Sequence, residues 1–286
     1  MMKKTMAILL AVLLVIGLSA CGNSTEPDGT AEVSSTAGLP GTETTEPGTE
    51  ASSAVTETET QTESTTEAAE EGVADPTALS DAELVGWFND RVNEVRVRKP
   101  KISRSEVQLI DNFKTSLVGG ALDGMINKII ADNVKGDPAY TTIQKGASNV
   151  GVFFSKLETF ALKPGDARSI TARKEGDNYV VTLQLGKETD PALGGASAYS
   201  RLLTYASPQE VLDGVAAVGI TGDINKFKNY YYDGRASITV NPAGEIVGAS
   251  SYYKSDADAK DAKLSIFKFD LVVTQHIDVK YSNFVW

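Results

Sequence analysis

Residues 236–254 read ASITVNPAGEIVGASSYYK, and this stretch decides the fold class. Two runs rich in Ile, Val and Tyr flank the turn sequence NPAG, and this composition is typical of two strands joined by a tight turn. Similar runs lie on both sides of it. The sequence therefore predicts a C-terminal β-meander with strands over 229–232, 236–240, 245–254, 263–269 and 271–281, and a polar turn over 255–261.

A second hairpin is predicted upstream of the meander. It pairs residues 167–174 with residues 178–186 across the turn sequence EGD at 175–177. Apolar residues recur at every second position of the second strand, which is the period of a strand with one buried face. These residues are Tyr179, Val181, Leu183 and Leu185.

Two helices are predicted ahead of this hairpin. Ser80 and Glu83 have the spacing of a capping box, and apolar residues at helical spacing follow until Pro100, so the first helix covers 81–97. A second amphipathic helix covers 121–133, where apolar residues again recur with the helical period.

The remaining segments carry weaker signals. Residues 102–116 fit the helical and strand periods poorly, and we expect an extended segment there. A loop is expected over 187–198. The sequence SPQE at 207–210 is a second capping-box pattern with Pro at the first helical position, and it predicts a short helix.

Helices that precede antiparallel strands predict an α+β domain rather than a parallel α/β domain. We expect one domain over 77–286, with N-terminal helices packed on an antiparallel β-sheet that ends in the C-terminal meander. The sheet would be curved if it encloses a ligand. A chain of this length can bury a sizeable core.

The acidic charge is concentrated in one segment. The 286-residue chain has a formal net charge of −11. Residues 22–76 hold 13 acidic and no basic side chains, whereas residues 77–286 hold 25 of each sign. We expect no nucleic-acid partner, because binding nucleic acid needs a basic face. One Cys and one His exclude multi-Cys and multi-His metal sites, and we expect no metal and no cofactor.

Residues 1–20 have the parts of a secretory signal peptide. Lys3 and Lys4 precede an apolar run of 11 residues over 6–16, which is shorter than the ~20 residues that span a bilayer. The run leads into LSAC at 18–21, which resembles the lipobox of bacterial lipoproteins. That resemblance implies cleavage between Ala20 and Cys21 and a diacylglycerol group on Cys21. The expected partner is the cell membrane, and the expected location is its extracytoplasmic face.

Residues 21–76 are predicted to be the lipidated Cys followed by a disordered tether. Residues 22–76 contain 19 Ser or Thr among 55 residues and no aromatic side chain, so they cannot bury enough apolar surface to fold. We interpret the segment as a spacer. A glycosylated stalk and a cation-binding acidic brush remain open alternatives.

The motifs for catalysis are incomplete. Residues 248–252 begin like G-x-S-x-G but lack the closing Gly, and Ser-x-x-Lys at 251–254 and 265–268 falls on predicted strands, where positions three apart face opposite sides. The lone His276 is interpreted as a solvated or structural side chain on a sheet face. An EF-hand-like start at Asp256 lacks the required Gly and Glu. These patterns favour a non-catalytic protein.

Three tyrosines are the candidate binding residues. Tyr230 and Tyr232 alternate on a predicted strand and share one face, and Tyr252 lies on a later strand. They could stack on a sugar or a peptide. The alternative is cross-strand packing at the rim of the sheet.

The folded region resembles uncharacterised lipoproteins of Gram-positive, Clostridia-type bacteria. The resemblance rests on the WFN sequence at 87–89 with Val92, Asn93, Val95 and Pro100, and on residues 241–250. It implies no activity and no site residues. Three functions are therefore considered: a lipid-anchored surface domain that binds a ligand or an envelope partner, a carrier of an apolar ligand in a cavity between sheet and helix, and a carboxylate-based cell-wall hydrolase.

Overall fold

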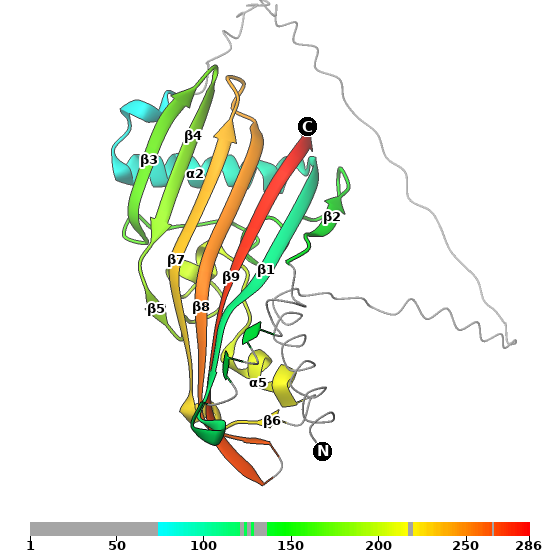
Figure 1. Ribbon diagram of the computed structural model, residues 1–286. Helices are drawn as coiled ribbons and strands as arrows, with labels where there is room; N and C mark the ends of the chain where they lie inside the picture. Colours follow the sequence, from blue (N-terminus) through cyan, green and yellow to red (C-terminus); the bar gives the residue numbers. More distant parts are fainter. Residues whose placement is uncertain (1–73, 121–122, 125–126, 129–135, 217–219, 265) are drawn as a thin grey trace, which may run out of the picture. The chain divides into compact units, whose positions relative to one another are not determined.

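The computed structural model describes residues 74–120, 123–124, 127–128, 136–216, 220–264 and 266–286. They form an open antiparallel sheet with few helices (Figure 1). The strands are β1 (Lys101–Thr115), β2 (Ala139–Ile143), β3 (Ala167–Glu175), β4 (Asn178–Leu185), β5 (Glu188–Thr189), β6 (Ile220–Thr221), β7 (Phe227–Val240), β8 (Ile246–Leu264) and β9 (Phe267–Val285). The helices are α2 (Asp81–Arg98), α4 (Ala198–Leu202), α5 (Pro208–Ala216), η1 (Pro76–Ala78), η2 (Leu117–Gly120) and η3 (Ile224–Lys226).

The strand order is β2-β1-β9-β8-β7-β4-β3, with β5 paired to β7 and β6 paired to β8. Every pairing is antiparallel. The predicted meander is confirmed in part: three long strands, β7, β8 and β9, take the place of the five expected ones. The strand expected over 263–269 is divided between the end of β8 and the start of β9, and β9 continues without a break at residue 270. The predicted hairpin is confirmed as β3 and β4. The extended segment predicted over 102–116 is β1, which returns beside β9. The fold is thus more sheet-dominated than the α+β arrangement predicted from the sequence.

The predicted break in the strand between residues 232 and 236 is wrong. Residues 227–240 form one strand, β7, with a bulge between Tyr232 and Arg235 in its pairing with β8. Asp233 adopts a φ of 54° at the bulge, and Gly234 is buried. A bulge inserts residues without ending the strand, so a local turn signal there marks a kink.

The predicted polar turn over 255–261 is also wrong, because these residues belong to β8. The alternation in this stretch uses small side chains: Ala259 is buried and Ala257 is half-buried, while Asp256 and Asp258 lie on the other face. Small apolar residues at every second position are a weak strand signal beside three aspartates. The loop predicted over 187–198 is interrupted by the short strand β5.

Helix α2 covers one end of the sheet and begins at the predicted capping box. The Ser80 backbone N–H donates to Glu83 Oε2 at 2.9 Å, and the Glu83 backbone N–H donates back to Ser80 Oγ at 3.5 Å. Its apolar face packs into a large aromatic core. Ring pairs in this core include Phe88 with Phe160 at 6.0 Å and Phe153 with Tyr281 at 4.9 Å.

Helix α5 covers the other end of the sheet and starts at the second predicted capping box, Ser207 with Glu210. A smaller core lies beneath it, and its members are mostly aliphatic or small side chains. The helix predicted over 121–133 lies largely outside the described residues, as do the predicted signal peptide and nearly all of the tether. Within the described part of the chain, no helix is long and apolar enough to cross a membrane.

Candidate functional site

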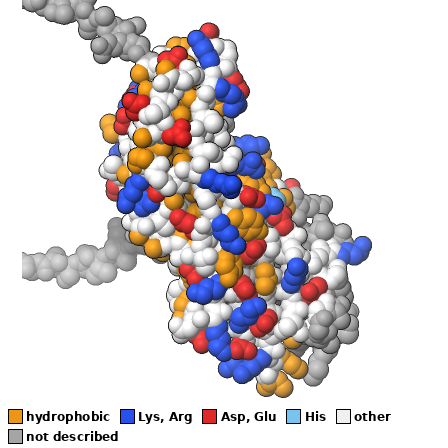
Figure 2. All heavy atoms as spheres, turned by 90° about the vertical axis from the view of Figure 1, so that its left-hand side faces the viewer, with side chains coloured by type: hydrophobic (Ala, Val, Ile, Leu, Met, Phe, Trp, Pro, Cys, Tyr) orange, Lys and Arg blue, Asp and Glu red, His pale blue; other side chains and the backbone are white. Residues whose placement is uncertain are grey.

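The two faces of the sheet differ in what covers them. Side chains that point toward the helices are mainly apolar and buried, whereas those on the other face are polar and partly open, as is common for antiparallel sheets. From the side of the β3 edge, Figure 2 shows acidic and basic side chains interspersed with apolar ones. The open face is therefore where a ligand can reach the sheet.

A polar groove of about 380 Å³ lies beside the β7 bulge. Three strands contribute to it: β3 near its start, β4 at its end and β7 at the bulge. Its lining carries three basic side chains and one acidic side chain. The lining residues are Arg168, Gln184, Leu185, Lys187, Tyr232, Asp233, Gly234 and Arg235.

Two of the basic groups are held over tyrosine rings. The Arg235 guanidinium lies 4.3 Å from the centre of the Tyr252 ring, and the Lys187 ammonium group lies 4.8 Å from the centre of the Tyr230 ring. Such cation–π contacts are worth about 0.5–1 kcal/mol at exposed sites. They restrict the two cations while leaving their N–H donors available.

Tyr232 contributes its side chain to the groove wall. Its hydroxyl donates a hydrogen bond to Asp256 Oδ1 at 3.1 Å. Burial, together with the nearby Asp256 carboxylate, raises the pKa of Tyr232 to about 12. The hydroxyl thus stays protonated at neutral pH, and its hydrogen is donated to Asp256 rather than to a ligand in the groove.

The three tyrosines predicted as binding residues are therefore close to the groove, in different roles. Tyr230 and Tyr252 lie beneath cations, and Tyr232 lines the groove. They do not form a bare stacking platform. Their neighbour Tyr231 points the other way into the core, as the two-residue period of a strand requires.

Sequence reasoning missed the three cations, Arg168, Lys187 and Arg235. They lie far apart in the chain and meet only because β4 pairs with both β3 and β7. One local signal was present: DGR at 233–235 inside a strand-like run is typical of a bulge, and bulges re-aim side chains.

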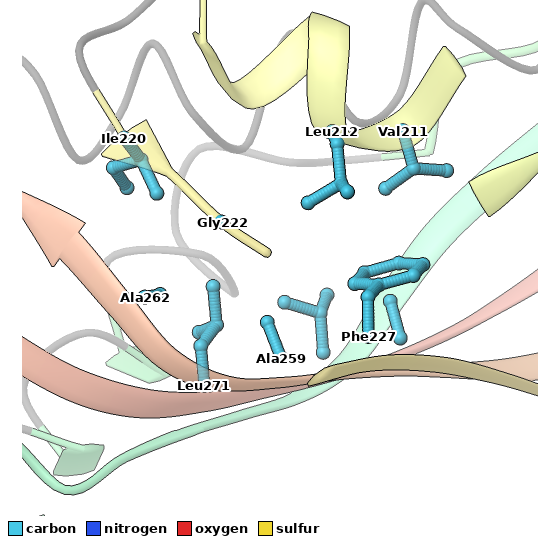
Figure 3. A pocket seen from close by; sticks show the side chains of 10 residues that line it. Val211, Leu212, Ile220, Gly222, Phe227, Ala259, Ala262 and Leu271 are labelled. Carbon is cyan, nitrogen blue, oxygen red and sulfur yellow. The ribbon is translucent and has the colours of Figure 1, made fainter. Parts of the chain in front are cut away.

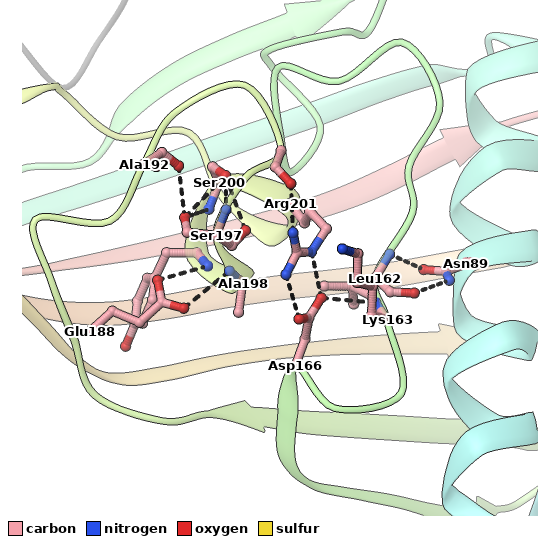
Figure 4. Close-up of polar contacts among 12 residues, drawn as sticks. Asn89, Leu162, Lys163, Asp166, Glu188, Ala192, Ser197, Ala198, Ser200 and Arg201 are labelled. Carbon is pink, nitrogen blue, oxygen red and sulfur yellow. Dashed lines mark hydrogen bonds and ion pairs between the residues drawn. The ribbon is translucent and has the colours of Figure 1, made fainter.

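A buried polar network supports the segments that carry two of these cations (Figure 4). Arg201 donates to both carboxylate oxygens of Asp166, at 2.6 and 2.5 Å, and both side chains are more than nine-tenths buried. Burial alone would raise the pKa of Asp166, but the hydrogen bond from Arg201 lowers it below its usual value. The Glu188 carboxylate accepts the backbone N–H groups of Ala198 and Tyr199 at the start of α4. Asp166 and Glu188 thereby fix the chain next to Arg168 and Lys187.

His276 lies on the open face in β9. Its Nδ1 is 2.7 Å from Asp111 Oδ1, and the two side chains are 21% and 30% exposed. The His276 ring centre is 5.8 Å from that of Tyr252. In the Ser-x-x-Lys motif at 251–254, Ser251 is buried in the core face, while Lys254 lies on the open face beside His276, so they do not converge.

A second hollow lies between α5 and the sheet (Figure 3), where Val211 and Leu212 point from the helix toward Phe227 and Leu271. Its walls are apolar and its volume is about 20 Å³, which is close to the space one water needs. Among the described residues, no group of three or more His, Cys, Asp or Glu side chains gathers to hold a metal ion.

No protein-family model, curated protein or solved structure matches this chain.

Proposed function

We propose that this protein is a lipid-anchored, extracytoplasmic surface protein whose sheet domain binds an anionic ligand in the groove beside the β7 bulge. One observation carries the choice of ligand. Within the described residues, Arg168, Lys187 and Arg235 converge on one groove and none of them forms an ion pair.

The chemistry of the groove fits a carboxylate or a phosphate group. Arginine presents paired N–H donors that match the geometry of both anions, and lysine adds a mobile point charge. Asp233 is the one acidic side chain among the described lining residues, so the site favours anions over cations. The three cations are exposed, and we therefore expect modest affinity for a single anion and stronger binding of a polymer with repeated charges.

The binding proposal is tested with inorganic pyrophosphate and with poly-glutamate as probes in titration calorimetry. Arg235→Gln and Lys187→Gln should each weaken binding about tenfold, because hydrogen bonds to charged groups contribute about 1.5–3 kcal/mol. Arg173→Gln is the control, since Arg173 lies on β3 like Arg168 of the groove but is paired with Glu175 and does not line the groove. Equal loss in all three variants would refute a specific site, and so would undetectable binding of both probes to the unmodified protein.

The anchoring proposal rests on the lipobox resemblance at 18–21. Cys21→Ala should release the protein from membranes or block processing of its precursor, whereas Ser24→Ala in the adjacent segment should change neither. Membrane fractionation with metabolic labelling by a radioactive fatty acid reads both outcomes. Unchanged membrane association and labelling in the Cys21 variant would exclude a lipoprotein.

Among the described residues, no observation specifically favours either alternative function. A carrier of an apolar ligand needs a cavity of a few hundred Å³. The helix over 121–133 that was expected to enclose such a cavity lies largely outside the described residues, and the apolar hollow under α5 measures about 20 Å³. A glycoside hydrolase uses two carboxylates across its cleft, and among the described lining residues of the groove only Asp233 is acidic.

A further inference from the structure

The end of the β8–β9 hairpin carries exposed apolar side chains. Ile266 is 86% exposed and Phe267 is 60% exposed. The hairpin lies at the lower end of the sheet in Figure 1, away from α2. Phe267 continues the inward-facing row of β9, whose next members, Phe269 and Leu271, are buried in the core. The apolar row thus runs out of the core and into solvent.

Two lysines flank these apolar side chains. Lys263 on β8 and Lys268 on β9 are directly opposite each other in the strand register and both are exposed. Like charges in this position destabilise a hairpin. Two other lysines at this end are in ion pairs: Lys226 pairs with Asp261, and Lys260 pairs with Asp258 and Asp270.

Within the described residues, Lys263 and Lys268 form no ion pair. Asp261 offsets part of the repulsion between them, since its pKa is lowered by Lys226 and, to a smaller extent, by Lys268 and Lys263. An external surface of negative charge would relieve the repulsion further. Apolar side chains at a tip with cations just behind them also match the layers of an anionic bilayer, where acyl chains lie below the charged headgroups.

We propose that the tip of the β8–β9 hairpin, defined by Lys263, Ile266, Phe267 and Lys268, inserts into the surface of an anionic phospholipid bilayer. Ile266 and Phe267 enter the boundary between headgroups and acyl chains. Lys263 and Lys268 contact the headgroup phosphates. This contact is separate from lipidation at Cys21 and would set the orientation of the sheet on the membrane.

The test uses the full chain carrying Phe267→Trp, reconstituted into vesicles of phosphatidylcholine and phosphatidylglycerol. Insertion predicts a blue shift of the added indole emission and its quenching by bromine-substituted acyl chains, relative to the unmodified chain. Val97→Trp is the matched control, because Val97 is 79% exposed but lies on α2 at the opposite end of the sheet. Its emission should be unaffected by bromine.

The charge requirement is tested in the same background. Replacing Lys263 or Lys268 by Gln should lower the bilayer affinity of the tip about fivefold each, since one basic side chain near an anionic surface contributes about 1 kcal/mol. Vesicles of phosphatidylcholine alone should give little quenching.

Three results would overturn the proposal. The first is no quenching at the tip in the anionic vesicles. The second is equal quenching at positions 97 and 267. The third is a blue shift that grows with protein concentration in the absence of vesicles, which would show that a second copy of the chain covers the tip. A failure of lipidation would be seen separately, as loss of the unmodified chain from the membrane fraction.

Discussion

The two ends of the sheet are stabilised in different ways. The core under α2 is built from large aromatic rings, and polar side chains of the helix bind the backbone of the adjacent loop: Asn89, Asn93 and Arg96 hold carbonyl groups between residues 149 and 162. The core under α5 is smaller, contains Phe113, Phe227 and Phe269 among mostly small and aliphatic side chains, and leaves an unfilled hollow. We infer that the α2 end is the rigid part, and that the groove is placed on it, while the hairpin tip extends from the looser end.

The largest test of this difference is Arg96→Met. The buried Arg96 guanidinium donates to Asn149 O at 2.6 Å and to the carbonyls of Phe153 and Ser155, each at 2.8 Å. Burial lowers the pKa of Arg96 to about 10. Its loss leaves buried carbonyls without donors, so we expect a drop of about 3–5 kcal/mol in the free energy of unfolding, measured with urea.

The matched control is Arg98→Met, two residues further along α2. Arg98 is 42% exposed and pairs with Glu94 and Glu245. Exposed ion pairs contribute about 0–1 kcal/mol. Equal losses for the two variants would contradict a structural role for the buried guanidinium.

A smaller effect is expected from Leu212→Ala at the α5 end. Leu212 lines the apolar hollow, and α5 has nine residues. The short helix can shift toward the sheet, so we expect a loss of about 2–3 kcal/mol, below that of Leu183→Ala in the α2 core. Chemical denaturation measures both.

The packing around Leu212 can also be tested with a double-mutant cycle that includes Gly222. A Cβ atom added at Gly222 would lie 2.8 Å from Leu212 Cδ2. Gly222→Ala should therefore lower the free energy of unfolding as a single change. It should lower it by less in the Leu212→Ala background, where the close contact with Leu212 is gone. Strict additivity of the two changes in free energy would show that Gly222 and Leu212 are not coupled through this contact.

Alkaline pH should act mainly on the α2 end. Burial raises the pKa of Tyr199 and of Tyr231 above the usual value, and both belong to the core under α2. A group whose pKa is raised on folding contributes its full stability below its unfolded pKa, about 10 for tyrosine, and loses it as pH rises toward the folded value.

We therefore expect stability to be constant between neutral pH and about pH 9, and to fall above about pH 10. The absorbance of tyrosinate measures ionisation of the buried tyrosines, and amide hydrogen exchange measures the accompanying loss of stability. Tyr231→Phe should reduce the slope above pH 10. Earlier loss of protection in α5 than in α2 would argue against this assignment.

The smallest effects are expected at the two capping boxes that the sequence predicted. Ser80→Ala and Ser207→Ala should each cost about 1 kcal/mol. Ser80 caps the helix that covers the aromatic core, so its loss should reduce global stability. Ser207→Ala should mainly increase local opening of α5, which amide exchange detects. A global effect from both would mean that the two ends unfold together.

Local patterns in the sequence were sufficient for several elements. The capping boxes at Ser80 and Ser207 marked the starts of α2 and α5, and period-two alternation marked β4. These signals are local because hydrogen bonds at a helix start and the faces of a strand depend on residues close in sequence. The alternation of Ala257 and Ala259 in β8 failed as a signal, since these small residues are covered only because the α5 segment packs over this face of the sheet.

The sequence by itself determined the separation of an acidic segment from a charge-balanced remainder, the lipobox resemblance at Cys21 and the presence of C-terminal strands. Tertiary structure decided where β1 and the β3–β4 hairpin pair, and with that the meeting of Arg168, Lys187 and Arg235 in one groove. The physical reason is the separation of the interacting residues along the chain. Net charge and hydrophobic periodicity can be read from residues that are close in sequence, whereas a groove depends on the register between strands that are tens of residues apart.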